Sequence, residues 1–261
     1  FPCSILSFLY FRFKISMYIL GISAFYHDSG ACFIRDGEIV FASQEERFSR
    51  IKNDSSFPLL AIKNGMDYLK INLEEIDEII FYEKPFLKFE RLIITYIKNF
   101  PFGLRQFLTS MVIWGKEKLF QRKIINDHLN QLSKNKLKNK FIIKFSDHHL
   151  SHASSAFYPS NFSNAAIITA DGVGEFATTT ISHGNDEAID IIKKIDYPDS
   201  LGLLYSAFTY YLGFKVNSDE YKVMGLAPYG EPKYKDIILK NIIDIKEDGS
   251  FRLNQKYFSY S

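Results

Sequence analysis

Short apolar runs separated by polar turns mark the start of the chain. Residues 18–22 predict a buried strand, a polar loop follows at residues 23–30, and residues 31–34 predict a second strand. Asp36 and Gly37 form a typical hairpin turn signal, so residues 38–43 are expected to return as a third strand.

Helical spacing replaces this pattern further on. Residues 58–69 carry apolar side chains three or four positions apart and predict a helix, and residues 76–82 predict the next strand. Residues 84–137 form a long aromatic-rich and basic region that we expect to be a helical insertion. Its lysine and arginine side chains most simply form a face exposed to solvent, and a partner-binding or membrane-lying surface is the alternative.

Strands and helices alternate again in the second half. Residues 141–145, 165–170 and 176–182 predict strands. A helix is expected from about Asp147, and another over residues 203–212. This alternation indicates an α/β fold.

Composition narrows the classes of function. The chain has 261 residues, 46% of them hydrophobic, and a net charge of +2, which gives no indication of nucleic-acid or membrane binding. The two cysteines, Cys3 and Cys32, match no metal-ligand spacing, so a cytoplasmic location is expected. Residues 1–16 are expected to be a non-native or disordered leader before Met17, with a membrane anchor as the alternative.

Three histidines within five residues are the strongest chemical signal. His148 and His152 would share one face of a helix, where two imidazoles can bind a divalent metal. His149 and His152 have a spacing that also permits pairing, and ordinary surface or core histidines are the alternative to a metal site. Ser146 or Asp147 would serve as the N-cap.

A glycine-bearing loop follows the predicted strand at residues 165–170. Asp171 is suited to metal binding, and Gly172, Gly174 and Glu175 are suited to a phosphate-binding cofactor loop. An ordinary turn is the alternative. Because ligands gather at the carboxyl ends of strands, this loop and the one after the first strand are expected to serve one site.

The loop after the first strand is a candidate site for a nucleotide or another phosphate. His27 and Asp28 lie within it, and a turn that caps its own backbone is the alternative. Arg47, Arg50 and Lys52 lie shortly after the third strand, where they can clamp a phosphate or form a solvated loop.

Taken in order, these segments resemble the carbamoyltransferase family of antibiotic-tailoring and nodulation enzymes. The segments that carry the resemblance are residues 21–28, 45–50, 147–153, 169–172, 199–205 and 219–230. The resemblance covers residues 17 to about 234 and is loose over residues 84–137.

The resemblance implies an actin/Hsp70/sugar-kinase-like (ribonuclease H-like) ATPase fold with a Kae1-like N-terminal domain. It makes His148, His152 and Asp171 ligands of iron or another divalent metal and leaves His149 outside the site. Asp171, Gly172, Gly174 and Glu175 would bind the ATP-derived cofactor, and His27, Asp28 and Lys52 would act in catalysis.

The implied reaction moves a carbamoyl group from carbamoyl phosphate, through carbamoyl-adenylate, to an acceptor hydroxyl on a sugar, an antibiotic or a Nod-factor-like molecule. No nucleic acid or membrane partner is implied. Residues 17–261 are expected to be part of the N-terminal domain, without the C-terminal YrdC-like domain and a later aspartate ligand. We therefore expect a weak metal site and no full catalytic cycle from this chain alone.

Two other classes of protein remain open from the sequence. One is another phosphate-handling enzyme of the same fold, such as a sugar kinase or a tRNA-modification relative. A histidine pair argues against the kinase, and the modest net charge gives little support to a tRNA role. The other is a non-catalytic module, which would have no need of His148 and His152.

Overall fold

The computed structural model describes residues 16–115, 120–133 and 141–258. They divide into two compact units, one containing residues up to Phe81 with Ile125–Lys144, and the other containing Tyr82–Ile124 with the residues from Phe145 onward. The expected leader falls almost entirely on residues 1–15, which lie outside the described residues. None of the described helices is long and apolar enough to cross a membrane.

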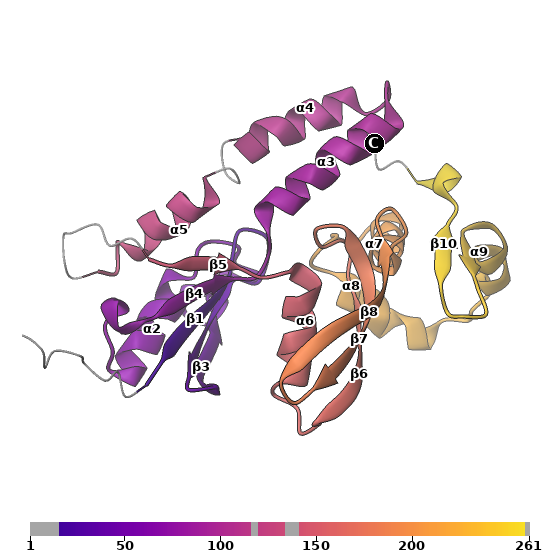
Figure 1. Cartoon of the computed structure of the whole chain (residues 1–261). Helices are drawn as coiled ribbons and strands as arrows, with labels where there is room; N and C mark the ends of the chain where they lie inside the picture. The colour runs from indigo at the N-terminus through magenta and orange to yellow at the C-terminus, as the bar shows by residue number, and fades with distance from the viewer. Residues whose placement is uncertain (1–15, 116–119, 134–140, 259–261) are drawn as a thin grey trace, which may run out of the picture. The chain divides into compact units, whose positions relative to one another are not determined.

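A mixed five-stranded sheet organises the first unit, in the order β3-β2-β1-β4-β5 (Figure 1). β1 (Tyr18–Ser23), β2 (Gly30–Arg35) and β3 (Glu38–Gln44) form an antiparallel meander. β4 (Glu78–Phe81) runs parallel to β1, and β5 (Ile143–Phe145) completes the sheet. The three strands predicted over residues 18–43 are confirmed.

Helix α2 (Leu59–Leu69) covers this sheet, as its apolar spacing predicts. A Cβ at Gly65 would lie 2.4 Å from the Phe33 ring, so only glycine permits this close packing. The buried Glu45 carboxylate accepts hydrogen bonds from the N–H groups of Leu60 and Ala61, at 2.9 and 2.8 Å. Part of the charged segment after β3 therefore caps a helix.

Short helices complete the first unit. α1 (Glu46–Ser49) follows β3, and the 3₁₀ helix η1 (Leu73–Glu75) precedes β4. The η1 turn delays the strand predicted from residue 76, which begins at Glu78. Helical character predicted for residues 84–137 is confirmed within the described residues 84–115 and 120–133, by α3 (Pro85–Asn99) and α4 (Leu104–Ile113) of the second unit and by α5 (Gln121–Leu129). Residues 116–119 and 134–137 of this prediction lie outside the described residues.

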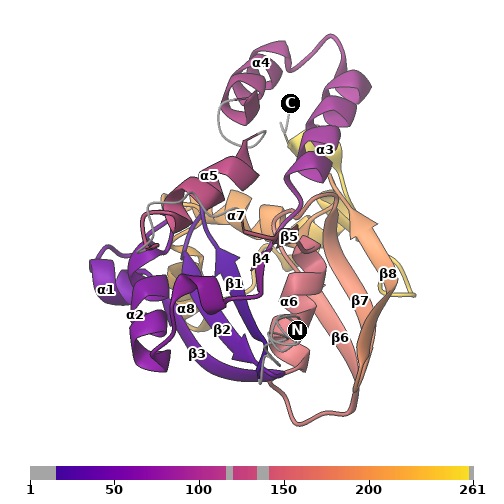
Figure 2. The same cartoon turned by 60° about the vertical axis from the view of Figure 1, so that its left-hand side comes forward.

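An antiparallel three-stranded sheet organises the second unit. Its strands are β6 (Asn164–Ala170), β7 (Ala177–Asn185) and β8 (Ala188–Asp196). α6 (His148–Phe157) runs along one face of the sheet (Figure 2), where Ala153 and Phe157 pack on Ile167. The predicted strands and helix here are confirmed, and β8 was not predicted.

The remaining elements of the second unit follow β8. They are α7 (Leu201–Tyr211), α8 (Glu220–Leu226), η3 (Ala227–Tyr229), α9 (Lys235–Asn241), β9 (Ile243–Ile245), β10 (Phe251–Leu253) and η4 (Gln255–Tyr257). β9 and β10 pair antiparallel around a small core. The chain is thus a mixed α/β structure.

Candidate metal centre

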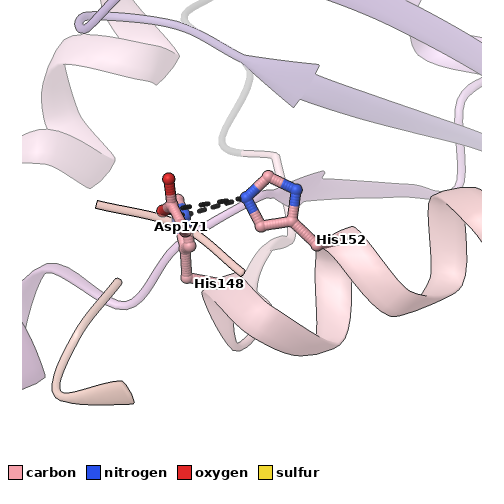
Figure 3. A group of neighbouring side chains, drawn as sticks. All are labelled: His148, His152 and Asp171. Atoms are coloured by element: carbon pink, nitrogen blue, oxygen red, sulfur yellow. Dashed lines mark hydrogen bonds and ion pairs between the residues drawn. The ribbon is translucent and has the colours of Figure 1, made fainter. Parts of the chain in front are cut away.

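Two histidines and an aspartate converge in the second unit (Figure 3). The Nε2 atoms of His148 and His152 are 3.1 Å apart, and Asp171 Oδ2 lies 2.7 Å from the first and 3.9 Å from the second. Ligand atoms of a tetrahedral site, each about 2.0–2.1 Å from the ion, are separated by about 3.3 Å. The three donors therefore fit one divalent metal ion with small adjustments.

The cluster has one sheltered side and one open side. The His148 side chain is 11% exposed, whereas the His152 side chain is 51% exposed. A metal held there would keep positions open to solvent or to substrate, as catalytic sites require.

Helix α6 positions the side chains of His148 and His152 next to each other. His148 and His152 are four residues apart and therefore project from the same face of the helix. Asp147 occupies the N-cap position, but its side chain makes no capping hydrogen bond and instead pairs with Lys84. Asp147 therefore lies at the expected N-cap position, but its side chain does not make the expected capping hydrogen bond.

Glu175 supplies the missing cap. Its buried carboxylate accepts a hydrogen bond from the His148 N–H, with both oxygens at 3.1 Å, and another from the Lys84 N–H at 2.9 Å. A carboxylate at a helix N-terminus satisfies free N–H groups and opposes the positive end of the helix dipole. Glu175 thus fixes the first turn of α6, from which His148 projects.

Asp171 is held by the loop that follows β6. Ser200 donates its hydroxyl to the carbonyl oxygens of Asp171 and Gly172, at 3.1 and 2.6 Å. A Cβ at Gly202 would lie 2.6 Å from the Asp171 backbone, so the start of α7 packs directly on this loop. The start of α7, about 30 residues further along the chain, therefore fixes the Asp171 backbone.

The Asp171 carboxylate is suited to bind a cation. Burial alone would raise its pKa, but the hydrogen bond and charge of His148 outweigh burial and hold the pKa well below its usual range. Asp171 is therefore ionised at neutral pH.

His149 lies in the interior and not in the cluster. Its Nδ1 is 2.6 Å from Thr169 Oγ1, and its Nε2 donates to the Ala177 carbonyl at 2.8 Å. Burial lowers the pKa of His149. With both ring nitrogens engaged, His149 does not pair with His152, and the geometry favours His148 as the second ligand.

The glycine loop packs against the same helix. A Cβ at Gly174 would lie 3.0 Å from ring carbons of both His148 and His149. The Gly174 N–H donates to Ala177 O at 3.0 Å, and its carbonyl accepts from Arg91 at 2.6 Å. Gly174 thus allows close packing, while the cofactor-binding role of Gly172, Gly174 and Glu175 stays a prediction.

His27, Asp28 and Lys52 belong to the first unit. His27 Nδ1 lies 2.8 Å from the Asp28 carboxylate, whose other oxygen accepts from Asn53 at 3.0 Å. Asp28 has a positive φ of 47°, and Lys52 is exposed. Asn53 ties the loop after β1 to the segment that contains Lys52. The catalytic roles of these residues stay predictions.

Sequence reasoning missed several residues that shape the centre. Lys84 and Arg91 contact the site through Asp147 and Gly174, which are 63 and 83 positions away. No local pattern signals such contacts. The sequence does carry a signal for Ser200, because a serine directly before a helix is a typical N-cap. Its hydroxyl accepts a hydrogen bond from the Leu203 N–H at 3.0 Å.

The chain belongs to the carbamoyltransferase N-terminus family, whose model matches residues 18–261. An uncharacterized protein of Synechocystis is 53% identical over 244 residues, which are 94% of this chain and 40% of that protein. The nodulation protein NolNO of Sinorhizobium fredii is 32% identical over 235 residues, which are 88% of this chain and 32% of that protein. The chain thus spans well under half the length of these relatives.

Proposed function

We propose that this chain contributes the metal-binding part of an O-carbamoyltransferase. The observation that carries the proposal is the convergence of His148, His152 and Asp171 within a member of this family. Two histidines and one carboxylate with open positions are typical of ferrous iron sites, and manganese or zinc also suits this donor set.

The proposed reaction transfers a carbamoyl group from carbamoyl-adenylate, made from carbamoyl phosphate and ATP, to an acceptor hydroxyl. The acceptor oxygen forms a bond to the carbamoyl carbon, the bond from that carbon to the adenylate oxygen breaks, AMP leaves, and a base takes the hydroxyl proton. A bound divalent metal would act as a Lewis acid toward an oxygen of the donor or the acceptor.

The chain's own residues have distinct roles in this proposal. His148 and His152 hold the metal from one helix face, and ionised Asp171 neutralises part of its charge. Gly172 is the proposed phosphate contact of this loop, and Gly174 lets the loop pack against the His148 and His149 rings. His27, with Asp28 beside it at 2.8 Å, is the proposed base, and Lys52 is a proposed contact to phosphate.

The order of elements supports an actin/Hsp70/sugar-kinase-like fold. Each unit has a three-stranded antiparallel meander followed by a helix: β1-β2-β3 with α1 and α2, and β6-β7-β8 with α7. The loop after the first strand of each meander carries Asp28 or Asp171. Such repetition suits a duplicated phosphate-handling fold.

Carbamoyl transfer is best tested in the longer Synechocystis relative. Purified protein would receive radiolabelled carbamoyl phosphate, ATP and candidate hydroxyl acceptors, with and without alanine at the positions aligned with His148 and His152. We expect acceptor labelling and AMP release to fall together by at least about 100-fold in the variant. Equal labelling in both proteins would contradict the proposal.

A further inference from the structure

Helices α3 and α4 form an antiparallel hairpin within the second unit (Figure 1). The rings of Tyr96 and Phe107 stack between the two helices, with centroids 4.2 Å apart. The rings of Phe89 and Trp114 stack further from the turn, with centroids 3.8 Å apart. These contacts hold the helices together and leave residues 100–103 as the tip of the hairpin.

The hairpin exposes large apolar side chains at and beside this tip. Phe100 and Phe102 are 69% and 74% exposed. Leu104, Leu108 and Val112 follow on α4 at intervals of four residues, so they lie along one side of the helix, and each is about half exposed. We call these five residues the hairpin patch. Neighbouring exposed apolar side chains of this size mark a protein or membrane contact.

The charge of the hairpin has a single sign. Between Glu90 and Glu117 the sequence contains four cations and no acidic residue. Two of these cations bracket the tip: Lys98 lies two residues before Phe100, and Arg105 lies three residues after Phe102, both exposed. The net charge of +2 for the whole chain conceals this local excess.

This combination favours an anionic membrane surface as the occupant of the hairpin patch. Apolar side chains that enter the headgroup region, with lysine and arginine around them, are what binding to such a surface requires. The long side chains of Lys98 and Arg105 keep their charge at the lipid phosphates while the rings beside them enter more deeply. The same uniform positive charge is complementary to an anionic surface and repels a second copy of the hairpin.

We propose that the hairpin patch docks this chain on a membrane surface that carries anionic lipid. The sequence left a solvated face and a partner-binding or membrane-lying surface open for this region, and the exposed patch with its cationic border favours the membrane. The proposal does not depend on the proposed carbamoyl transfer.

Vesicle flotation of the 261-residue chain tests this proposal. The probes are vesicles of phosphatidylcholine with about one third phosphatidylglycerol, and vesicles of phosphatidylcholine alone. We expect the chain to float with the anionic vesicles and to bind the neutral ones at least about ten-fold more weakly, because the cations then lose their attraction to the surface.

Phe100→Ser/Phe102→Ser removes both rings of the tip. It should weaken binding to the anionic vesicles at least about ten-fold, because less apolar surface enters the headgroup region. Its matched control is Phe162→Ser/Tyr210→Ser, whose rings are 69% and 77% exposed elsewhere in the second unit. This control should bind as the wild type does.

Lys98→Gln/Arg105→Gln removes the two cations beside the tip. Binding to the anionic vesicles should weaken by about ten- to thirty-fold, and by less at high salt, where the charges are screened. Lys235→Gln/Lys240→Gln is the matched control, because both lysines are exposed on α9 and the same charge is lost. It should keep most of the binding.

Several results would overturn the proposal: no flotation with anionic vesicles, equal binding to neutral and anionic vesicles, or equal binding by the wild type and Phe100→Ser/Phe102→Ser. A fourth is a wild-type chain that does not float and sediments as a dimer, while the Phe100→Ser/Phe102→Ser variant is a monomer. That result would assign the hairpin patch to a second copy of the chain.

Metal content of the same variants separates this test from the proposed function. Both hairpin variants should bind metal as the wild type does, because neither changes His148, His152 or Asp171. A chain that binds metal and no vesicles refutes only the membrane contact, whereas a chain that floats without metal refutes only the metal centre.

Discussion

The carboxylate of Glu175 accepts a hydrogen bond from the backbone N–H of His148, with both oxygens at 3.1 Å. This contact joins the loop after β6 to the first turn of α6, so the elements that carry Asp171 and His148 are fixed to each other. The same carboxylate binds the Lys84 N–H at the start of α3. One buried side chain thus orders three segments around the proposed metal centre.

Removing this carboxylate should destabilise the second unit. Glu175→Ala leaves the N–H groups of His148 and Lys84 without their acceptor, at a cost of about 1–3 kcal/mol in the free energy of unfolding. Urea denaturation measures this, with Glu187→Ala on an exposed turn as the control. If the two variants unfold at the same urea concentration, Glu175 has no such role.

Gly174→Ala tests the packing of the glycine loop on the histidines. The added methyl group would lie 3.0 Å from ring carbons of His148 and His149, so the loop or the rings must shift. We expect a loss of about 1–3 kcal/mol in stability together with weaker metal binding.

Gly225→Ala is the matched control, because an added Cβ there meets nothing within 4 Å and the residue lies in α8. It should leave stability unchanged or slightly higher. Equal behaviour of the two alanine variants would argue against close packing at Gly174.

Substitution of His149 should mainly lower stability, whereas substitution of His152 should mainly lower metal affinity. His149→Ala empties a buried position and removes partners of Thr169 and Ala177, at a cost of about 2–4 kcal/mol in stability. His152→Ala changes a half-exposed side chain, so stability should change by less than about 0.5 kcal/mol while metal affinity falls. Thermal unfolding and metal titration of both variants check this contrast, and a reversed pattern would place the ligand at His149.

In protein freed of metal by a chelator, the free energy of unfolding should fall as the solution becomes mildly acidic. Burial lowers the pKa of both His149 and His128, so below about 6.5, the ordinary imidazole value, the unfolded chain binds protons that the folded chain does not. The free energy of unfolding is therefore retained above that pH and declines as pH falls toward the lowered folded-state values. The slope of this free energy against pH should be smaller in His149→Gln than in the wild type, and an unchanged slope would contradict the assignment.

Local patterns predicted the elements that depend on neighbouring residues. Alternating and continuous apolar runs located β1, β2, β3 and β6, and the spacing of His148 and His152 placed both on one helix face. β8 escaped prediction because Ile191, Ile192, Lys193 and Lys194 do not alternate, and both faces of this strand are largely exposed.

The supporting contacts of the site depend on residues far apart in the chain. Glu175 was assigned to a cofactor loop because it follows Gly174, and its partners Lys84 and His148 are 91 and 27 positions away. The choice between His148 and His149 needed the interior hydrogen bonds of His149, which no helical spacing reveals.

Metal content of the purified chain tests the central claim most directly. After equilibrium dialysis against excess ferrous iron, which fills a weak site as well, elemental analysis corrected for the dialysate should find about one ion per wild-type chain and almost none in His148→Ala/His152→Ala, because two of three ligands are lost. His183→Ala, which removes a histidine elsewhere on β7, should keep its metal. A wild-type chain without metal, or equal metal in the wild type and the double variant, would contradict a metal centre at these residues.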